Sequence, residues 1–201
     1  MSANPVLAPV FPVEMRLRLA RREAAALALF FDSFFERVYA YLRRLVGDEH
    51  LAEDLTQEVF LQAQRALGSY DPTRDPRPWL YTIATNKLRD HWRARAARGD
   101  GAELSLDHEE LVERPATVQR APDAIAGEEE LALRVRAAID ALPEGLRATV
   151  LLRVYEGLSF EEIGHILGRN EVAVRKRYSR ALSALRETLG ELWKLSVEGP
   201  R

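Results

Sequence analysis

The large apolar residues between positions 27 and 46 recur every three or four residues, which is the spacing of one buried stripe on an α-helix. The stripe consists of Leu27, Phe31, Phe34, Phe35, Val38, Leu42 and Leu45. Gly47 follows as a C-terminal glycine, and Asp48 is placed to cap a second helix. The buried side of that helix carries Leu51, Leu55, Val59, Ala63 and Leu67. The two patterns predict a helical hairpin.

Helical spacing continues through most of the remaining chain. It resumes after a loop that contains Pro72, Pro76 and Pro78, and it runs from Trp79 to about Arg98. Four more helices are expected, over Leu131 to Leu142, Glu144 to Tyr155, Ser159 to about Leu167, and from Asn170 to about Leu195. Because no convincing strand pattern occurs, the 201 residues predict an all-α protein of two small helical domains.

Charge divides the chain into segments of opposite sign. Residues 100–130 carry ten acids against two bases, whereas 74–98 carry seven bases against two acids and 169–186 carry six bases against one. Residues 99–127 also lack periodicity and contain several glycines and prolines, which predicts an acidic linker. The expected organisation is an N-terminal extension (1–24), a first helical domain (25–98), the acidic linker (99–127), a second helical domain (128–195) and a tail (196–201).

Composition excludes several classes of protein. The chain has no cysteine, which removes disulfides, thiol nucleophiles and cysteine-based metal sites and favours a cytoplasmic location. No uncharged apolar run reaches the roughly 18 residues of a membrane span, so no membrane insertion is expected. No nucleophile, histidine pair or glycine-rich phosphate loop accompanies the acidic residues. We therefore expect no catalytic site, no metal and no cofactor.

The last two predicted helices have the layout of a helix-turn-helix. Ser159 and Glu162 form a capping box, and a turn of Gly168, Arg169 and Asn170 leads into a long basic helix. With Val174 directed to the core, about 100° per residue also turns Tyr178, Ala181, Leu182 and Leu185 inward. The same rotation places Val172, Lys176, Ser179, Arg180 and Ser183 on the outward face, with Arg175 and Arg177 at its flanks. This face is predicted to bind DNA; the alternative is a solvated basic face on a structural helix.

Several motifs, in order along the chain, resemble the extracytoplasmic-function (ECF) sigma factors of bacteria. In the first half they are residues 52–60 (AEDLTQEVF), 78–86 (PWLYTIATN) and 89–93 (RDHWR). In the second half they are 142–147 (LPEGLR) and 156–164 (EGLSFEEIG). The resemblance covers about 25–98 and 128–190, and it implies a non-enzymatic subunit that directs RNA polymerase to promoters.

The resemblance also implies roles for individual residues. Docking on a coiled coil of core RNA polymerase falls to Asp54, Gln57 and Glu58. Capture of the melted minus-10 strand falls to Arg74, Arg77, Asn86, Lys87, Arg89 and Arg93. Reading of minus-35 duplex DNA falls to Arg169, Val172, Arg175, Lys176, Arg177, Ser179 and Arg180. Trp79 and Trp92 lie in the apolar pattern and are expected in the core rather than stacked on bases.

The recognition helix departs from its relatives. Where the family commonly has Gly-Thr-Val-Lys-Ser-Arg, residues 172–177 read Val-Ala-Val-Arg-Lys-Arg, which predicts minus-35 binding with an altered sequence preference. The family often uses an anti-sigma partner, although no residue here identifies one. Two alternatives stay open: a helix-turn-helix regulator that does not bind polymerase, and a helical interaction protein that does not bind DNA.

Overall fold

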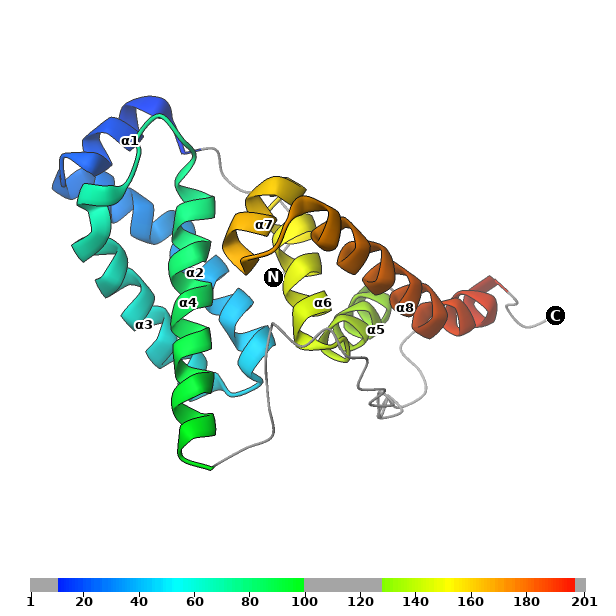
Figure 1. Ribbon diagram of the computed structural model, residues 1–201. Helices are drawn as coiled ribbons and strands as arrows, with labels where there is room; N and C mark the ends of the chain where they lie inside the picture. Colours follow the sequence, from blue (N-terminus) through cyan, green and yellow to red (C-terminus); the bar gives the residue numbers. More distant parts are fainter. Residues whose placement is uncertain (1–10, 100–127, 198–201) are drawn as a thin grey trace.

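The computed structural model describes residues 11–99 and 128–197, and within these ranges the chain is helical. The N-terminal domain packs four α-helices beside one another (Figure 1). They are α1 (Val13–Ala20), α2 (Ala24–Val46), α3 (Glu49–Ala66) and α4 (Pro76–Ala97), with a short 3-10 turn at Leu67–Ser69 between the last two. The helical hairpin predicted over residues 27–67 is confirmed, and it consists of α2 and α3.

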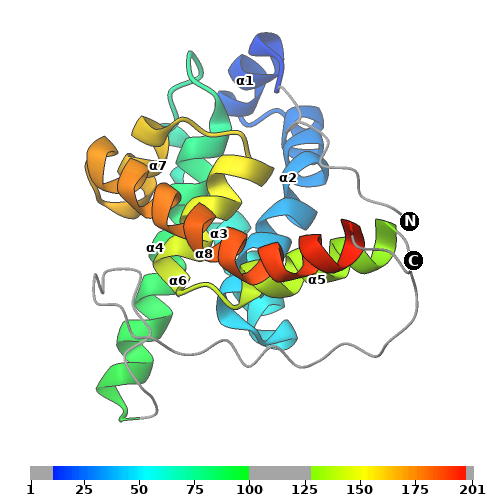
Figure 2. The same cartoon turned by 90° about the vertical axis from the view of Figure 1, so that its right-hand side faces the viewer.

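The C-terminal domain contains the other four helices, and α5 and α8 run side by side in it (Figure 2). They are α5 (Glu128–Asp140), α6 (Glu144–Val150), α7 (Phe160–Leu167) and α8 (Glu171–Val197). The expected helix from Glu144 to Tyr155 is confirmed in extent, but Leu151–Tyr155 is π-helical. The end of this segment contacts the N-terminal domain, where Arg37 of α2 donates to the backbone oxygen of Tyr155.

Local capping explains where the helices begin and end. Gly47 takes a left-handed φ of 75° after α2, and the Asp48 side chain accepts a hydrogen bond from the Leu51 amide at 3.0 Å. The Asp75 side chain accepts from the Arg77 amide at 2.8 Å, with Pro76 at the first position of α4. The hairpin and the direction of α4 therefore follow from short-range signals in the sequence.

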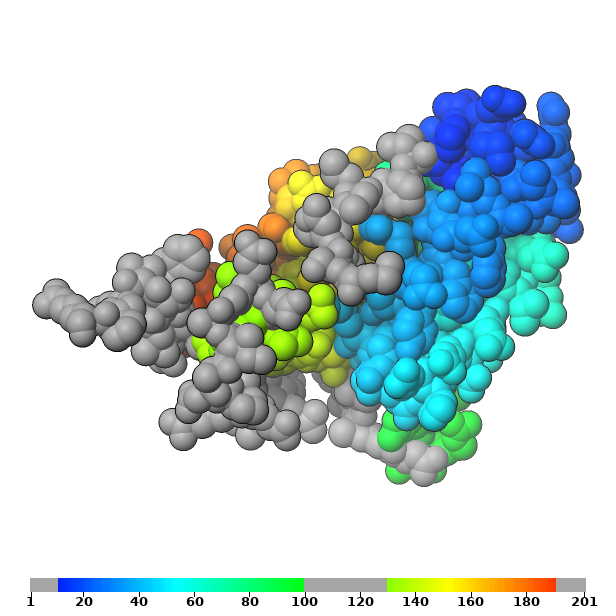
Figure 3. All heavy atoms as spheres, turned by 180° about the vertical axis from the view of Figure 1, so that it is seen from behind, coloured from blue at the N-terminus to red at the C-terminus, as the bar shows by residue number. Residues whose placement is uncertain are grey.

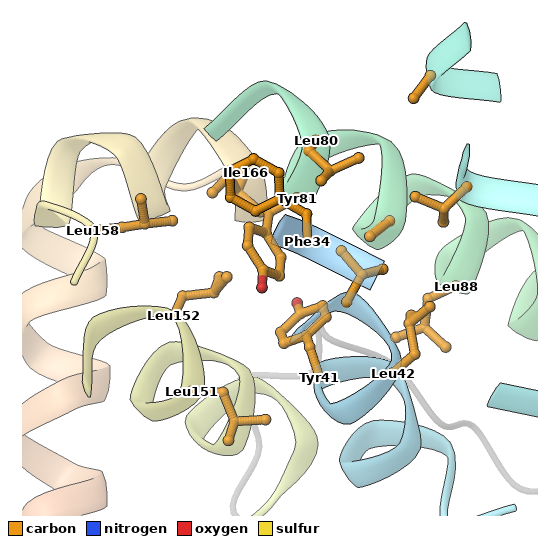
Figure 4. Packing of buried hydrophobic residues seen from close by; sticks show 14 of the residues in the cluster. Phe34, Tyr41, Leu42, Leu80, Tyr81, Leu88, Leu151, Leu152, Leu158 and Ile166 are labelled. Carbon is orange, nitrogen blue, oxygen red and sulfur yellow. The ribbon is translucent and has the colours of Figure 1, made fainter. Parts of the chain in front are cut away.

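One hydrophobic core continues across both domains. Figure 4 shows Phe34, Leu42, Leu80 and Leu88 of the N-terminal domain packed with Leu151, Leu152, Leu158 and Ile166 of the C-terminal domain. The prediction that the two tryptophans belong to the core is confirmed: Trp92 is buried, and Trp79 packs against the same cluster. The domains therefore share apolar surface that each would expose on separation.

The N-terminal extension and the acidic linker were both expected to lie outside the two helical domains. Residues 11–20, assigned from the sequence to an N-terminal extension, include α1, and both Phe11 and Leu19 are buried against the N-terminal domain. The acidic linker lies almost wholly outside the described residues. Among the helices that the structure describes, none is long and apolar enough to cross a membrane.

Candidate nucleic-acid interface

The helix-turn-helix predicted from the sequence is present in α7 and α8. The Ser159 hydroxyl accepts from the Glu162 amide at 3.2 Å, and the Glu162 carboxylate accepts from the Ser159 amide at 2.7 Å, which completes the capping box. Gly168 ends α7 with a left-handed φ of 63°. The Asn170 side chain then accepts from the Ala173 amide at 2.8 Å. These contacts set the position at which α8 begins.

Close packing also fixes the turn. A Cβ atom added to Gly164 would lie 2.6 Å from the backbone oxygen of Arg169, so only glycine fits between α7 and the turn. The start of α8 is therefore held both by its cap and by a backbone contact with α7.

The outward face of α8 is arranged as the helical rotation predicts. Its members, Val172, Lys176, Ser179, Arg180 and Ser183, are all exposed, while Val174 and Ala181 are fully buried on the opposite side. A face with lysine, serine and arginine at its centre can donate hydrogen bonds to phosphates and to guanine edges.

The structure contradicts two predictions about which side chains of α8 are buried. Leu182, expected in the core stripe, is 41% exposed, so that prediction is wrong. Arg177, expected at a flank of the outward face, is buried. It lies roughly 60° around the helix from Val174, at the edge of the buried stripe, where packing against neighbouring elements decides the burial. Arg169 is half-buried in the turn. In this conformation neither arginine lies on the outward face, and their roles at DNA stay predictions.

Arg175 lies over α7. Its guanidinium pairs with Glu171, at 3.0 Å from Nε to the carboxylate, and stands 4.6 Å from the centre of the Phe160 ring. Arg153 stands 4.7 Å from the centre of the same ring, so two guanidinium groups contact Phe160. Nothing in the local sequence pattern indicates this cluster, because Arg153 and Arg175 belong to different helices.

The six residues predicted to bind the minus-10 strand differ in how accessible they are on the N-terminal domain. Arg74, Asn86 and Arg93 are exposed. Lys87 is half-buried and its ammonium lies 3.1 Å from the carboxylate of Glu58 on α3. Exposed ion pairs of this kind contribute little stability, so Lys87 can exchange its partner for a phosphate.

The other two residues contact the C-terminal domain. The Arg77 guanidinium donates to the backbone oxygen of Glu156 at 2.8 Å. The Arg89 guanidinium donates to the backbone oxygens of Leu167 at 2.6 Å and Ile166 at 3.4 Å, at the end of α7. Carbonyl oxygens in the last turn of a helix lack partners within that helix, which makes this end a favourable place for a cation.

Sequence reasoning missed the other half of this interdomain contact. Arg37 on α2 donates to the backbone oxygen of Tyr155 at 2.5 Å and to the Glu156 carboxylate at 3.1 Å. Glu156 is buried, with only 4% of its surface exposed. Arg37 and Glu156 are separated by 119 residues in the chain, and no local pattern connects them.

Buried tyrosines lie beside this contact, where the hydroxyl-bearing ends of Tyr41 and Tyr81 point toward one another (Figure 4). Burial raises the pKa of Tyr41 to about 12, although a hydrogen bond with Thr85 opposes the rise. Burial also raises the pKa of Tyr81 well above its usual value, and the nearby Glu156 carboxylate adds to the rise. Both phenols therefore keep their protons to a higher pH than an exposed tyrosine does.

The α3 face predicted to bind polymerase is exposed at Asp54, Gln57 and Glu58. Figure 3 shows α2 and α3 together on one side of the molecule, with α5 beside them. Gln57 also lines a groove of about 590 Å³ between these two helices. The apolar side chains that line it are Leu27, Phe30, Phe31, Phe35, Phe60, Leu61, Ala63 and Leu67.

The groove corrects one prediction about α2. Phe31 was expected in the buried stripe, but it is 44% exposed, so that prediction is wrong. Phe30 takes the interior position instead, because it lies about 40° from Phe34 around the helix, whereas Phe31 lies about 60° away on the other side. The two acids and the aromatic groove thus form neighbouring parts of one accessible surface.

Comparison with known proteins finds matches to both domains, in the same order along the chain. Models of Sigma-70 region 2 and Sigma-70, region 4 match residues 30–98 and 132–185. The chain is 30% identical over 177 residues to the RNA polymerase sigma-H factor of Pseudomonas aeruginosa, covering 87% of this chain and 92% of that protein. It is 41% identical over 166 residues to the RNA polymerase sigma factor CarQ of Myxococcus xanthus, covering 78% and 84%.

A solved structure is similar along most of the chain as well. CnrH, solved in complex with the cytosolic domain of CnrY, aligns with a TM-score of 0.61 and 26% identity. The alignment covers 90% of this chain and 98% of CnrH.

Proposed function

The chain belongs to the ECF sigma factors, non-enzymatic subunits that direct RNA polymerase to promoters, and we propose that its two domains divide promoter recognition between them. The N-terminal domain binds core polymerase and captures the minus-10 strand, and the C-terminal domain reads minus-35 duplex DNA. One observation carries this division: each domain presents its own cationic surface, on α4 and on α8.

Polymerase binds the exposed side of α3. Asp54 and Glu58 are one helical turn apart and supply two carboxylates, which suit a basic partner surface. The neighbouring groove supplies exposed aromatic area at Phe31, which suits apolar side chains of the same partner. An acidic rim beside an aromatic groove therefore supports docking of a helical element that carries both basic and apolar residues.

Minus-10 capture requires the domains to separate. Arg74, Asn86 and Arg93 are accessible for single-stranded DNA, but Arg77 and Arg89 donate to backbone oxygens of the C-terminal domain. Opening exchanges these carbonyl partners for phosphates of the melted strand. The arrangement in the structure is thus a closed form of the subunit, and the initiating form has its domains apart.

The protein acts in the cytoplasm, where its polymerase and chromosomal DNA are found. The similar protein CnrH was solved with the cytosolic domain of a second protein, CnrY. By analogy, a protein regulator holds this chain inactive until it is released.

Reconstitution with core polymerase and genomic DNA fragments tests the proposal. We expect transcripts that start at specific promoters only when the chain is present, and we expect the Asp54→Ala, Glu58→Ala double variant to lose them. An Asp32→Ala, Glu36→Ala variant, which changes two exposed acids on α2, is the matched control. If the chain bound duplex DNA without producing promoter-specific starts, a regulator that does not bind polymerase would replace the sigma-factor mechanism.

A further inference from the structure

Val172 is an unusual residue on the outward face of α8. The residue is 75% exposed, the largest exposed fraction among the large apolar residues that the structure describes. It is the second residue of α8, directly after Glu171. A scattered exposed valine would need no explanation, but this one stands in the turn of a recognition helix from which base edges are normally contacted.

The position of this side chain is well defined. The Asn170 cap and the close approach of Gly164 to Arg169 fix the start of the helix, as described above. Valine is branched at Cβ and strongly prefers one rotamer in a helix, so its two methyl groups are presented in a fixed direction. Lys176 lies one turn farther along the same exposed face. An apolar contact and a cationic donor are therefore presented side by side.

The polar neighbours in the first turn contact the protein itself. Glu171 pairs with Arg175, and Arg175 stacks on Phe160. The Asn170 side-chain oxygen accepts from the helix backbone. The group that the first turn extends outward is consequently the apolar side chain of Val172.

We propose that Val172 contacts the C5 methyl group of a thymine in the major groove of minus-35 DNA. Thymine alone among the four bases presents a methyl group there, so an exposed valine can distinguish it by apolar contact. Lys176 would contact a neighbouring base edge or phosphate. This inference rests on the proposed minus-35 role of α8 and adds a base preference to it.

Replacement of thymine by deoxyuridine tests the contact directly, because it removes only the methyl group. Duplexes bound by the reconstituted holoenzyme are first selected from a pool with a randomised minus-35 element. Each thymine of the selected element is then replaced in turn. We expect replacement at one position to weaken wild-type binding about fourfold, which corresponds to one buried methyl group.

The Val172→Ala variant completes the test. We expect it to bind the thymine and uracil duplexes equally, while Val13→Ala, which shortens another exposed valine on α1, keeps the fourfold difference. Circular dichroism checks that Val172→Ala retains its helices.

Three results would overturn the inference. If the holoenzyme selects a minus-35 element but uracil costs nothing at any position, the methyl contact is absent and the proposed function stands. If Val172→Ala keeps the full difference, another residue reads the methyl group. If no minus-35 element is selected, the minus-35 role itself fails, and the contact fails with it.

Discussion

The two cationic surfaces of the molecule differ in what their residues contact. On α8, Val172, Lys176 and Arg180 face outward and are exposed. On α4, Arg77 and Arg89 donate hydrogen bonds to backbone oxygens of the C-terminal domain. The surface proposed to read duplex DNA is therefore accessible, whereas part of the surface proposed to capture the minus-10 strand is occupied by the C-terminal domain. Under the proposed function, capture of the strand thus depends on domain opening.

The surfaces of α4 and α8 also differ in their apolar packing. Leu80 and Leu88 of α4 share a core with Leu152 and Ile166 of the C-terminal domain, and all four are almost fully buried. Opening would expose this apolar surface to water, so the closed form is favoured until polymerase or DNA compensates for the loss. Within residues 11–99 and 128–197, no such packing covers the outward face of α8. Changes that act on opening should consequently spare binding to minus-35 duplex DNA.

The largest effect is expected from a covalent bond that holds the domains together. The chain has no cysteine, so the Arg44→Cys, Asp140→Cys double variant carries the only two thiols. They replace two side chains that form an ion pair across the domains, 3.0 Å from Arg44 Nη1 to Asp140 Oδ1. Joining them with a disulfide-containing bismaleimide should reduce promoter-specific transcription to the fraction left uncrosslinked. Binding to minus-35 duplexes should persist, and reduction of the linker should restore transcription.

Each single-cysteine variant treated with the same reagent is the control. Normal initiation by the fully crosslinked protein would show that the closed form is competent, and the difference between the two surfaces would then have no functional consequence.

Alkaline pH is expected to lower the free energy of unfolding through the buried phenol of Tyr41. Burial raises the pKa of Tyr41 to about 12 from its ordinary value of about 10, so the folded protein retains this proton where the unfolded chain loses it. The stabilising contribution is therefore complete below about pH 10 and is lost as the pH rises toward about 12, amounting to about 2–3 kcal/mol. Urea unfolding between these pH values should show a steeper decline for wild type than for Tyr41→Phe. Parallel declines would mean that Tyr41 titrates alike in both states.

Local sequence signals predicted much of the fold and part of the site. The capping box at Ser159 and the turn before α8 involve residues within four positions of one another, and both are confirmed. The contact of Arg37 with Glu156 spans 119 residues, and its formation depends on how two domains pack. Helical rotation also predicted the outward face of α8 correctly. It did not settle Arg177 of α8 or Phe31 of α2, because each lies about 60° from the buried stripe of its own helix, where packing against neighbouring elements decides the burial.

On the accessible surface, removal of one cation should have a clear but smaller effect. Lys176→Ala should weaken binding to minus-35 duplexes about tenfold, because a base contact contributes about 1–3 kcal/mol. Arg186→Ala removes the same charge from an exposed position farther along α8 and is the matched control. Gel-shift titration of the holoenzyme on a duplex with only the minus-35 element measures both. An equal loss of affinity in the two variants would indicate general electrostatic attraction to DNA rather than a specific contact made by Lys176.

The smallest effect is expected from a change of one charge at the interdomain contact. Glu156→Gln keeps the size of the side chain and the backbone oxygen that accepts from Arg77, but it replaces the ion pair with Arg37 by a neutral hydrogen bond. A charged hydrogen bond exceeds a neutral one by about 1 kcal/mol, so the closed form should weaken roughly fivefold.

Binding of a single-stranded minus-10 oligonucleotide by the free chain measures that change, because this strand requires Arg77 and Arg89 to leave their carbonyl partners. We expect tighter strand binding in Glu156→Gln and unchanged binding to minus-35 duplexes. Glu161→Gln, which removes an exposed charge at the start of α7, should change neither. A lower melting temperature with unchanged strand binding would place the role of Glu156 within the C-terminal domain alone, since a residue that restrains opening must affect the surface that opening uncovers.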